Sequence, residues 1–169
     1  MVLILIGMPG CGKSCMGRAL SRKLKMKNID GDRVIEKMTG KRLQEIIDDE
    51  GLEGFKKIEE EALLSIKGDN IIISTGGSAV YYESVMNYFK SIGKVVYLYC
   101  TLDVLKGRLG NLAQRGVVLK QSQTLEDLYK ERCALYEKYA DITVDCSGNA
   151  YSKYQSRVIT AVKYLAQEQ

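Results

Sequence analysis

Short apolar runs alternate with amphipathic segments along most of this sequence. Continuous apolar runs such as residues 2–6 are typical of strands buried on both faces of a parallel sheet. We expect strands at residues 2–6, 27–30, 71–74, 95–100 and 142–144. Between them, apolar residues recur every three or four positions, which is the helical period. We expect helices at residues 13–24, 33–38, 42–50, 52–67, 82–91, 102–109, 125–139 and 151–165.

This alternation of strands and helices predicts an α/β fold with a parallel sheet and helices on both faces. The chain has 169 residues, which fits a single domain over residues 1–169. In such folds, ligands bind beyond the carboxyl ends of the strands. The first three predicted strands end at Gly7, Asp30 and Ser74, so chemistry is expected at these positions.

Composition and charge exclude several classes of function. The net charge of +4 is too small and too dispersed to indicate a nucleic-acid partner, and no apolar run is long enough to cross a membrane. The chain has no histidine, which excludes hydrolase mechanisms built on a serine–histidine or cysteine–histidine pair. Its five cysteines include no C-x-x-C pair and fit reduced thiols in a cytoplasmic protein.

The segment from Gly7 to Ser14 reads G-M-P-G-C-G-K-S and meets the P-loop spacing G-x-x-x-x-G-K-S. It follows a predicted strand and opens a predicted helix, as the motif requires. Backbone N–H groups there should surround the phosphates of ATP; the nucleotide-binding residues are expected to be Gly10, Cys11, Gly12, Lys13, Ser14 and Cys15. Lys13 is expected to reach the outer phosphates, and the Ser14 hydroxyl to bind Mg²⁺.

A second motif, Asp30-Gly31-Asp32, follows the second predicted strand. Two carboxylates at this place can divide their work. One can help to hold hydrated Mg²⁺, while the other accepts a hydrogen bond from a substrate hydroxyl. An isolated D-G-D sequence would more simply be an acidic turn in solvent, but the P-loop upstream favours the functional interpretation.

Five motifs in this order resemble the shikimate kinase family. They are the P-loop, residues 30–36, Thr39-Gly40, residues 55–59 and residues 74–77. The resemblance implies one P-loop domain with a five-stranded parallel sheet in the order 2-3-1-4-5, flanked by helices. It also implies a helical substrate-binding segment over about residues 32–61 and transfer of the ATP γ-phosphoryl group to the 3-hydroxyl of shikimate. Residues 110–123, which lack periodicity, are expected to form a mobile lid.

The resemblance also implies roles for individual residues. Asp30 is expected on the metal side together with Ser14 and, through water, Ser74. Asp32 is expected to bind the acceptor hydroxyl and to take its proton. The other residues implied are Lys56, Gly76, Gly77 and Arg132 for acceptor binding, Lys13 and the lid residue Arg115 for catalysis, and Arg108 beside the adenine.

Several positions depart from the family pattern. Lys56 stands where family members carry an arginine that binds the acceptor carboxylate, and Ser78 replaces the third glycine of a triplet. A lysine supplies charge but not the two-pronged fork of a guanidinium. Two alternatives therefore stay open. One is a kinase for another small alcohol such as gluconate, and the other is a regulatory protein that binds nucleotide without kinase activity.

The acidic stretch between residues 48 and 61 is typical of a solvated helix face. Glu59 is a candidate exception, because it lies one helical turn from Lys56 and could position it. From the motifs and the resemblance together we expect a monomeric small-molecule kinase that depends on ATP and Mg²⁺.

Overall fold

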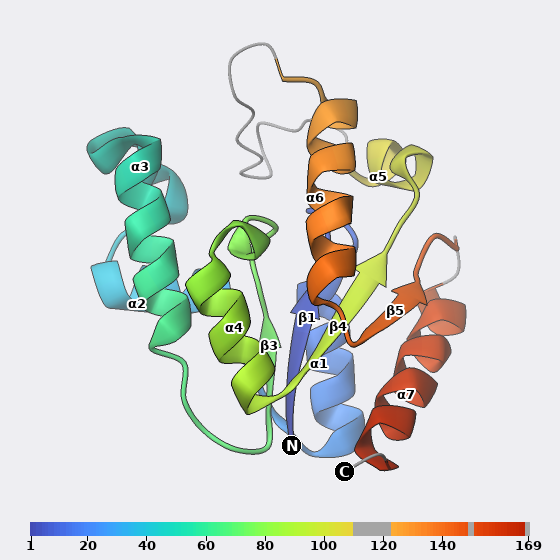
Figure 1. Ribbon diagram of the computed structural model, residues 1–169. Helices are drawn as coiled ribbons and strands as arrows, with labels where there is room; N and C mark the ends of the chain where they lie inside the picture. Colours follow the sequence, from blue (N-terminus) through green and yellow to red (C-terminus); the bar gives the residue numbers. More distant parts are fainter. Residues whose placement is uncertain (110–122, 149–150, 168–169) are drawn as a thin grey trace.

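The computed structural model describes residues 1–109, 123–148 and 151–167 (Figure 1). At its centre lies a five-stranded sheet in the order β2-β3-β1-β4-β5, and every neighbouring pair is parallel. The strands are β1 (Val2–Ile6), β2 (Lys27–Asp30), β3 (Ile71–Ser74), β4 (Lys94–Tyr99) and β5 (Ile142–Asp145). The predicted fold class and strand order are therefore confirmed.

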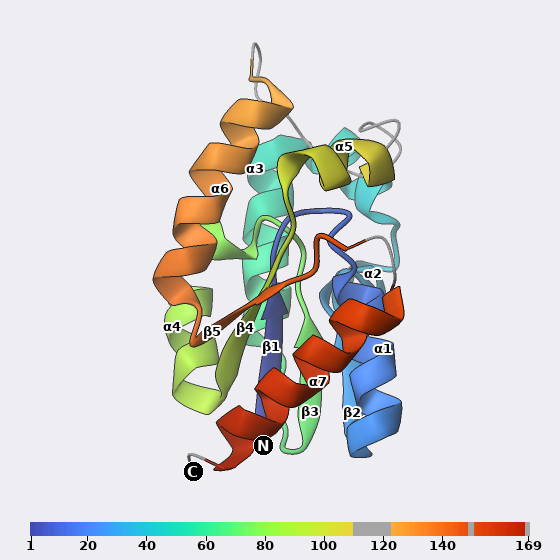
Figure 2. The same ribbon diagram turned by 90° about the vertical axis from the view of Figure 1, so that its right-hand side faces the viewer.

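Helices cover both faces of this sheet, as Figure 2 shows. One face carries α1 (Lys13–Leu24) and α7 (Tyr151–Gln167), which contact each other. The other carries α4 (Glu83–Ile92) and α6 (Leu125–Tyr139), which both contact β4. The remaining helical elements are α2 (Gly31–Thr39), α3 (Leu43–Leu64), η1 (Ala79–Tyr81) and α5 (Leu102–Leu109). None of the described helices is both long and apolar enough to cross a membrane.

The core follows from the apolar runs in the sequence. All five side chains of β1 are buried, because β3 and β4 flank the strand and helices cover both of its faces. Burial of a side chain such as Leu3 or Ile4 contributes about 1.5–3 kcal/mol relative to exposure. The carboxyl end of this buried central strand leads into Gly7, at the end of the sheet where the carboxyl ends of all five parallel strands lie.

At one side of the sheet, β2 is an edge strand of four residues. Five basic side chains line a groove beside it: Arg18, Lys27, Arg33, Lys37 and Lys67. Asp30 also lines this groove and is its one carboxylate among the described residues. The groove thus carries more positive than negative side chains beside this strand.

Most predicted elements occur within one or two residues of their expected ends, and the largest difference is in α3. The sequence predicts two helices, at 42–50 and 52–67, and the backbone of α3 leaves the helical conformation at Gly51, which confirms the predicted break. The second part ends at Leu64 instead of residue 67. Gly51 has φ 67°, a left-handed conformation that glycine adopts without steric cost. The short helix η1 was not predicted. All but the last residue of the expected lid at 110–123 lies outside the described residues.

Candidate active site

Three glycines shape the loop between β1 and α1. Gly7, Gly10 and Gly12 have φ values of 144°, 81° and 99°, which residues with a side chain rarely adopt. Gly12 is the N-cap of α1 and provides no side-chain hydrogen bond. The first N–H groups of α1 therefore have no side-chain cap, and a helix start of this kind favours anions. The predicted strand–loop–helix context of the P-loop is confirmed.

The side chain of Lys13 lies inside this loop. Its Nζ donates hydrogen bonds to the carbonyl oxygens of Gly7 at 2.7 Å and Met8 at 3.0 Å. The residue is only 7% exposed. A buried ammonium without a carboxylate partner among the described residues is well placed to exchange carbonyl oxygens for phosphate oxygens.

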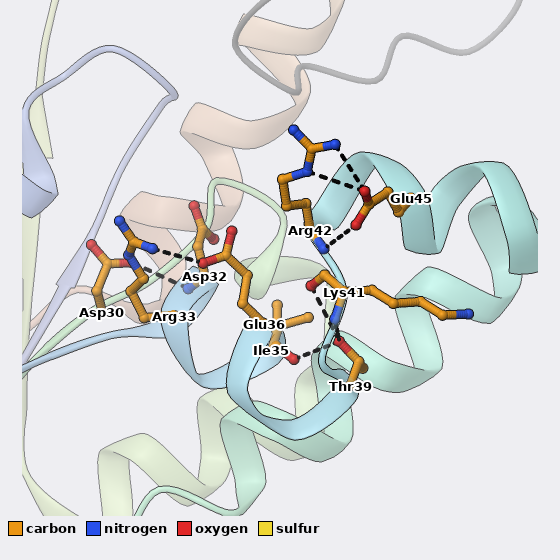
Figure 3. Close-up of polar contacts among 9 residues, drawn as sticks. All are labelled: Asp30, Asp32, Arg33, Ile35, Glu36, Thr39, Lys41, Arg42 and Glu45. Carbon is orange, nitrogen blue, oxygen red and sulfur yellow. Dashed lines mark hydrogen bonds and ion pairs between the residues drawn. The ribbon is translucent and has the colours of Figure 1, made fainter.

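The carboxyl ends of β2 and β3 bring two more predicted residues to the same end of the sheet. Asp30 and Ser74 are register partners in the parallel pair β2–β3, and Ser74 Oγ donates to the carbonyl oxygen of Lys13 at 3.3 Å. Asp30 is also the N-cap of α2, where its Oδ1 accepts from the Asp32 backbone N–H at 3.2 Å (Figure 3). Lys13, Ser74, Asp30 and Asp32 are therefore linked in one region.

These residues suit a magnesium ion that takes only some of its ligands from the protein and the rest from water and substrate phosphates. Among the described residues, no cluster of three or more histidine, cysteine, aspartate or glutamate side chains could hold a metal alone. Mg²⁺ usually keeps several waters and binds through one or two carboxylates plus substrate phosphates. The Ser14 hydroxyl, Asp30 and, through water, Ser74 are hard oxygen donors of the right kind for such a site.

Asp32 lies in an environment that opposes its negative charge. Burial and, to a smaller extent, the nearby carboxylates of Asp30 and Glu59 together raise its pKa to about 6, while Lys13 opposes the rise. A carboxyl group with a raised pKa beside a phosphate-binding loop is a suitable acceptor for a hydroxyl proton near neutral pH.

The turn after β3 closes the other side of this region. A Cβ at Gly76 would lie 2.7 Å from Glu59 Oε1 and 3.7 Å from Asp32 Oδ1. A Cβ at Gly77 would lie 2.9 Å from a terminal nitrogen of Arg132. Only glycine leaves room here. The structure thus brings four of the predicted acceptor-site residues together: Asp32, Gly76, Gly77 and Arg132.

Arg132 is a buried cation on α6. It is 7% exposed and forms no ion pair among the described residues. Its Nε donates to the Tyr81 hydroxyl at 3.3 Å, and its guanidinium carbon lies 5.2 Å from the centre of the Tyr81 ring. The Glu59 carboxylate interacts with this charge at longer range without forming an ion pair. A buried cation without a direct ion pair is costly, so this arrangement favours an anionic ligand.

Glu59 has different partners from those expected. It is 2% exposed and accepts hydrogen bonds from Ser78 Oγ at 2.8 and 2.7 Å and from the Tyr82 hydroxyl at 2.7 Å. Burial raises its pKa, and these hydrogen bonds oppose the rise. Sequence reasoning missed these partners, because Ser78 is 19 residues away and has no periodic relation to Glu59.

The contact expected between Glu59 and Lys56 is therefore wrong. Lys56 Nζ instead pairs with Glu53 Oε1 at 2.6 Å, and both side chains are substantially exposed. Glu53 and Glu59 are each one turn from Lys56, but Glu59 faces the interior, where Ser78 binds it. The long side chain of Lys56 remains in water.

The other predicted residues belong to neighbouring parts of the fold or lie outside the described residues. Arg108 donates to the carbonyl oxygens of Cys146 at 3.1 Å and Gly148 at 3.2 Å, and so ties α5 to the loop after β5. Its guanidinium carbon lies 5.4 Å from the centre of the Tyr154 ring. Arg115 lies outside the described residues. In the P-loop segment Cys11 is buried, whereas Cys15 is exposed.

The fold and the site together define a class of protein, the P-loop kinases that act on small molecules. A family model described as "Shikimate kinase" matches residues 9–163. The chain belongs to the shikimate kinase family. ATP is the co-substrate of this family.

Individual relatives agree with this assignment. The chain is 36% identical over 162 residues to a shikimate kinase of Francisella tularensis subsp. novicida, covering 94% of this chain and 92% of the relative. A solved shikimate kinase from Acinetobacter baumannii, in complex with shikimate, has a TM-score of 0.85 and 28% identity, covering 96% of this chain and 93% of that one. The shikimate kinase of Aquifex aeolicus has a TM-score of 0.83 and 28% identity over the full length of both chains.

Proposed function

We propose that this protein transfers the γ-phosphoryl group of ATP to the 3-hydroxyl of shikimate. The observation that carries the proposal is the position of Asp32. It lies beside the P-loop lysine on one side and the glycine turn at Gly76 on the other. Arg132 follows at the far side of the same turn, next to Gly77. This order suits an acceptor with a hydroxyl at one end and a carboxylate at the other.

The nucleotide is held by the loop residues Gly10 to Cys15, and Arg108 lies beside the adenine. When Lys13 leaves the carbonyl oxygens of Gly7 and Met8, its ammonium can bind the outer phosphates. Bound Mg²⁺, held by Ser14, Asp30 and, through water, Ser74, would neutralise charge on the phosphates. Phosphoryl transfer depends mainly on such positioning and positive charge.

The acceptor is oriented by groups on the other side. Asp32 accepts the hydrogen bond of the attacking hydroxyl and takes its proton as the new O–P bond forms and the bond to ADP breaks. Arg132, the backbone at Gly76 and Gly77, and Lys56 bind the acceptor. Lys13 and Arg115 supply positive charge to the transferring group. These assignments extend the family pattern to this chain residue by residue.

The test is ADP release by the purified protein with Mg-ATP, with and without shikimate. We expect release that depends on shikimate and on Mg²⁺, and strong loss in Asp32→Asn, since removing a positioned acid–base group typically costs about 10²–10⁴-fold. Activity on gluconate or another small alcohol, but not on shikimate, would support a kinase of altered specificity; the ion pair of Lys56 with Glu53 favours that alternative. ATP binding without transfer to any alcohol tested would support a regulatory role.

We further propose that the protein acts as a monomer in the cytoplasm. None of the five cysteines, which all lie in the described part of the chain, forms a disulfide, and this fits a reducing compartment. Light scattering at micromolar concentration checks the oligomeric state. A mass near 18.9 kDa is expected, and a stable dimer would contradict the proposal.

A further inference from the structure

Arg132 is held by a neutral partner and by no described acidic one. The Tyr81 hydroxyl accepts from Arg132 Nε at 3.3 Å, and the Tyr81 ring lies beside the guanidinium. A protein carboxylate in this place would satisfy the charge of Arg132 and compete with a carboxylate on the acceptor. A phenol fixes the orientation of the guanidinium and leaves its charge for the ligand.

The contacts of Arg132 also restrict how its guanidinium group can turn. Nε is engaged by Tyr81, and a terminal nitrogen lies close against the turn at Gly77. The carbonyl oxygen of Gly77 accepts in turn from the Tyr136 hydroxyl at 2.7 Å, which anchors the turn to α6. The guanidinium is therefore held between η1 on one side and the glycine turn on the other. Such a held fork binds a carboxylate at a lower entropic cost than a mobile one.

The hydrogen bond between Tyr81 and Arg132 also joins two elements. It links η1 to α6, which pack against each other. Burial raises the pKa of Tyr81, the hydrogen bond with Arg132 lowers it, and the Glu131 carboxylate raises it further. The Tyr81 hydroxyl therefore stays protonated and neutral beside Arg132 near neutral pH.

We propose that Tyr81 is a positioning residue of the acceptor site, which orients Arg132 toward an acceptor carboxylate. The proposal rests on the proposed function for the identity of the acceptor. The second guanidinium typical of the family is absent here, because the corresponding residue is Lys56, which pairs with Glu53. Orientation of the remaining arginine then has a larger share in acceptor affinity.

The test compares wild type with Tyr81→Phe, which keeps the ring and removes the hydroxyl. We expect KM for shikimate to rise by about threefold to tenfold with kcat within about twofold, because one hydrogen bond to a charged group is lost. With an analogue in which the carboxylate is replaced by a hydroxymethyl group, KM should be the same for both proteins. Equal changes in KM for acid and alcohol would overturn the proposal, as would an unchanged KM for shikimate.

Two further variants sharpen this comparison. Tyr81→Glu adds a carboxylate beside Arg132 and should raise KM for shikimate more than Tyr81→Phe; a lower KM would overturn the proposal. Tyr164→Phe removes a phenol hydroxyl from a residue that is 56% exposed on α7 and serves as the matched control, with unchanged constants. Thermal unfolding of each variant shows that it is folded.

A direct measurement does not depend on the acceptor. The Nε–H resonance of Arg132, assigned by its loss in Arg132→Lys, should shift in Tyr81→Phe and exchange faster with water. If wild type shows no shikimate-dependent ADP release, the proposed function fails, while this comparison still decides whether Tyr81 positions Arg132. An unchanged Nε–H shift and exchange rate would overturn the positioning role even in an active enzyme.

Discussion

The environment of Asp32 opposes the ionised form of its carboxyl group. Its folded-state pKa of about 6 lies above the ordinary value of 3.8, chiefly because of burial. A group with a raised folded pKa contributes stability that is fully present below the unfolded pKa and is lost as pH rises through the folded one. The ionised side chain that accepts a proton in the reaction therefore lowers the stability of the ligand-free protein at neutral pH.

This loss of stability with rising pH gives the first prediction. Relative to Asp32→Asn, the wild-type protein should lose stability between about pH 4 and pH 7, by up to about 3 kcal/mol for a shift of about two units. Urea unfolding of both ligand-free proteins at several pH values measures this. Asp145→Asn is the matched control with the opposite sign, because hydrogen bonding with Ser147 lowers the pKa of Asp145. A wild-type to Asp32→Asn difference that is constant with pH would contradict the prediction.

Lys56 gives a second prediction at the residue scale. An exposed ion pair such as Lys56–Glu53 contributes only about 0.2–1 kcal/mol, so Lys56 can leave Glu53 for an acceptor at little cost. Lys56→Arg should lower KM for shikimate, because a guanidinium forms two hydrogen bonds with a carboxylate. Steady-state kinetics measures the change. Lys57→Arg, on the neighbouring exposed residue, should leave KM unchanged, and a higher KM in Lys56→Arg would argue against acceptor binding by residue 56.

At the scale of elements, close packing of α1 on the sheet holds the P-loop in place. A Cβ at Gly17 would collide with the side chains of Ser74 and Asn28, which lie on β3 and β2. Ser74 also donates to the carbonyl oxygen of Lys13. The position of α1 over the ends of these strands is thus set by the absence of a side chain at one residue.

The third prediction tests this packing. Gly17→Ala should destabilise the fold by about 1–3 kcal/mol, the usual cost of overfilling a packed site, and should raise KM for ATP because Lys13 and Ser74 shift. Gly107→Ala is the control. Nothing lies within 4 Å of a Cβ there, and alanine favours a helix interior over glycine by about 0.5–1 kcal/mol. Thermal unfolding and ATP kinetics measure both, and equal stability of the two variants would contradict the argument.

The sequence was sufficient for elements with a clear period, and insufficient where contacts join distant residues. The apolar runs and the P-loop spacing predict β1, the loop and α1 with the observed bounds. Gly51 marks the predicted break between two helices, and its backbone is indeed non-helical there, in a conformation that glycine adopts without steric cost. The three residues of η1 are too few to show a helical period in the sequence. The hydrogen bonds of Glu59 with Ser78 and Tyr82 join α3 to this turn and could not be read from spacing.

At the scale of the whole molecule, ligands should add stability that the empty site lacks. Lys13 is satisfied by loop carbonyl oxygens in the ligand-free protein, so the loop is formed before nucleotide binds. A ligand that binds only the folded state stabilises it by about 2.7 kcal/mol at 100 times its Kd. Binding should therefore shift unfolding of the entire domain.

The fourth prediction is that Mg-ATP raises the Tm and that excess EDTA reduces the shift. Mg²⁺ neutralises the phosphates, and its removal should weaken nucleotide binding. Differential scanning calorimetry with ATP, with and without EDTA, measures the effect. Lys13→Met should lose most of the shift. An equal shift with and without EDTA would argue against a metal ion held by Ser14 and Asp30.

The edge strand β2 has a consequence for behaviour at high concentration. An open strand edge is a template for pairing with another molecule, and short strands and lysine side chains are the usual protection. Here the strand has four residues, and the groove beside it carries one carboxylate, that of Asp30, and five basic side chains: Arg18, Lys27, Arg33, Lys37 and Lys67. Two such edges repel each other, most strongly at low ionic strength. In concentrated solution, pairing of the β2 edge of one molecule with that of another is thereby disfavoured, and added salt should weaken this protection.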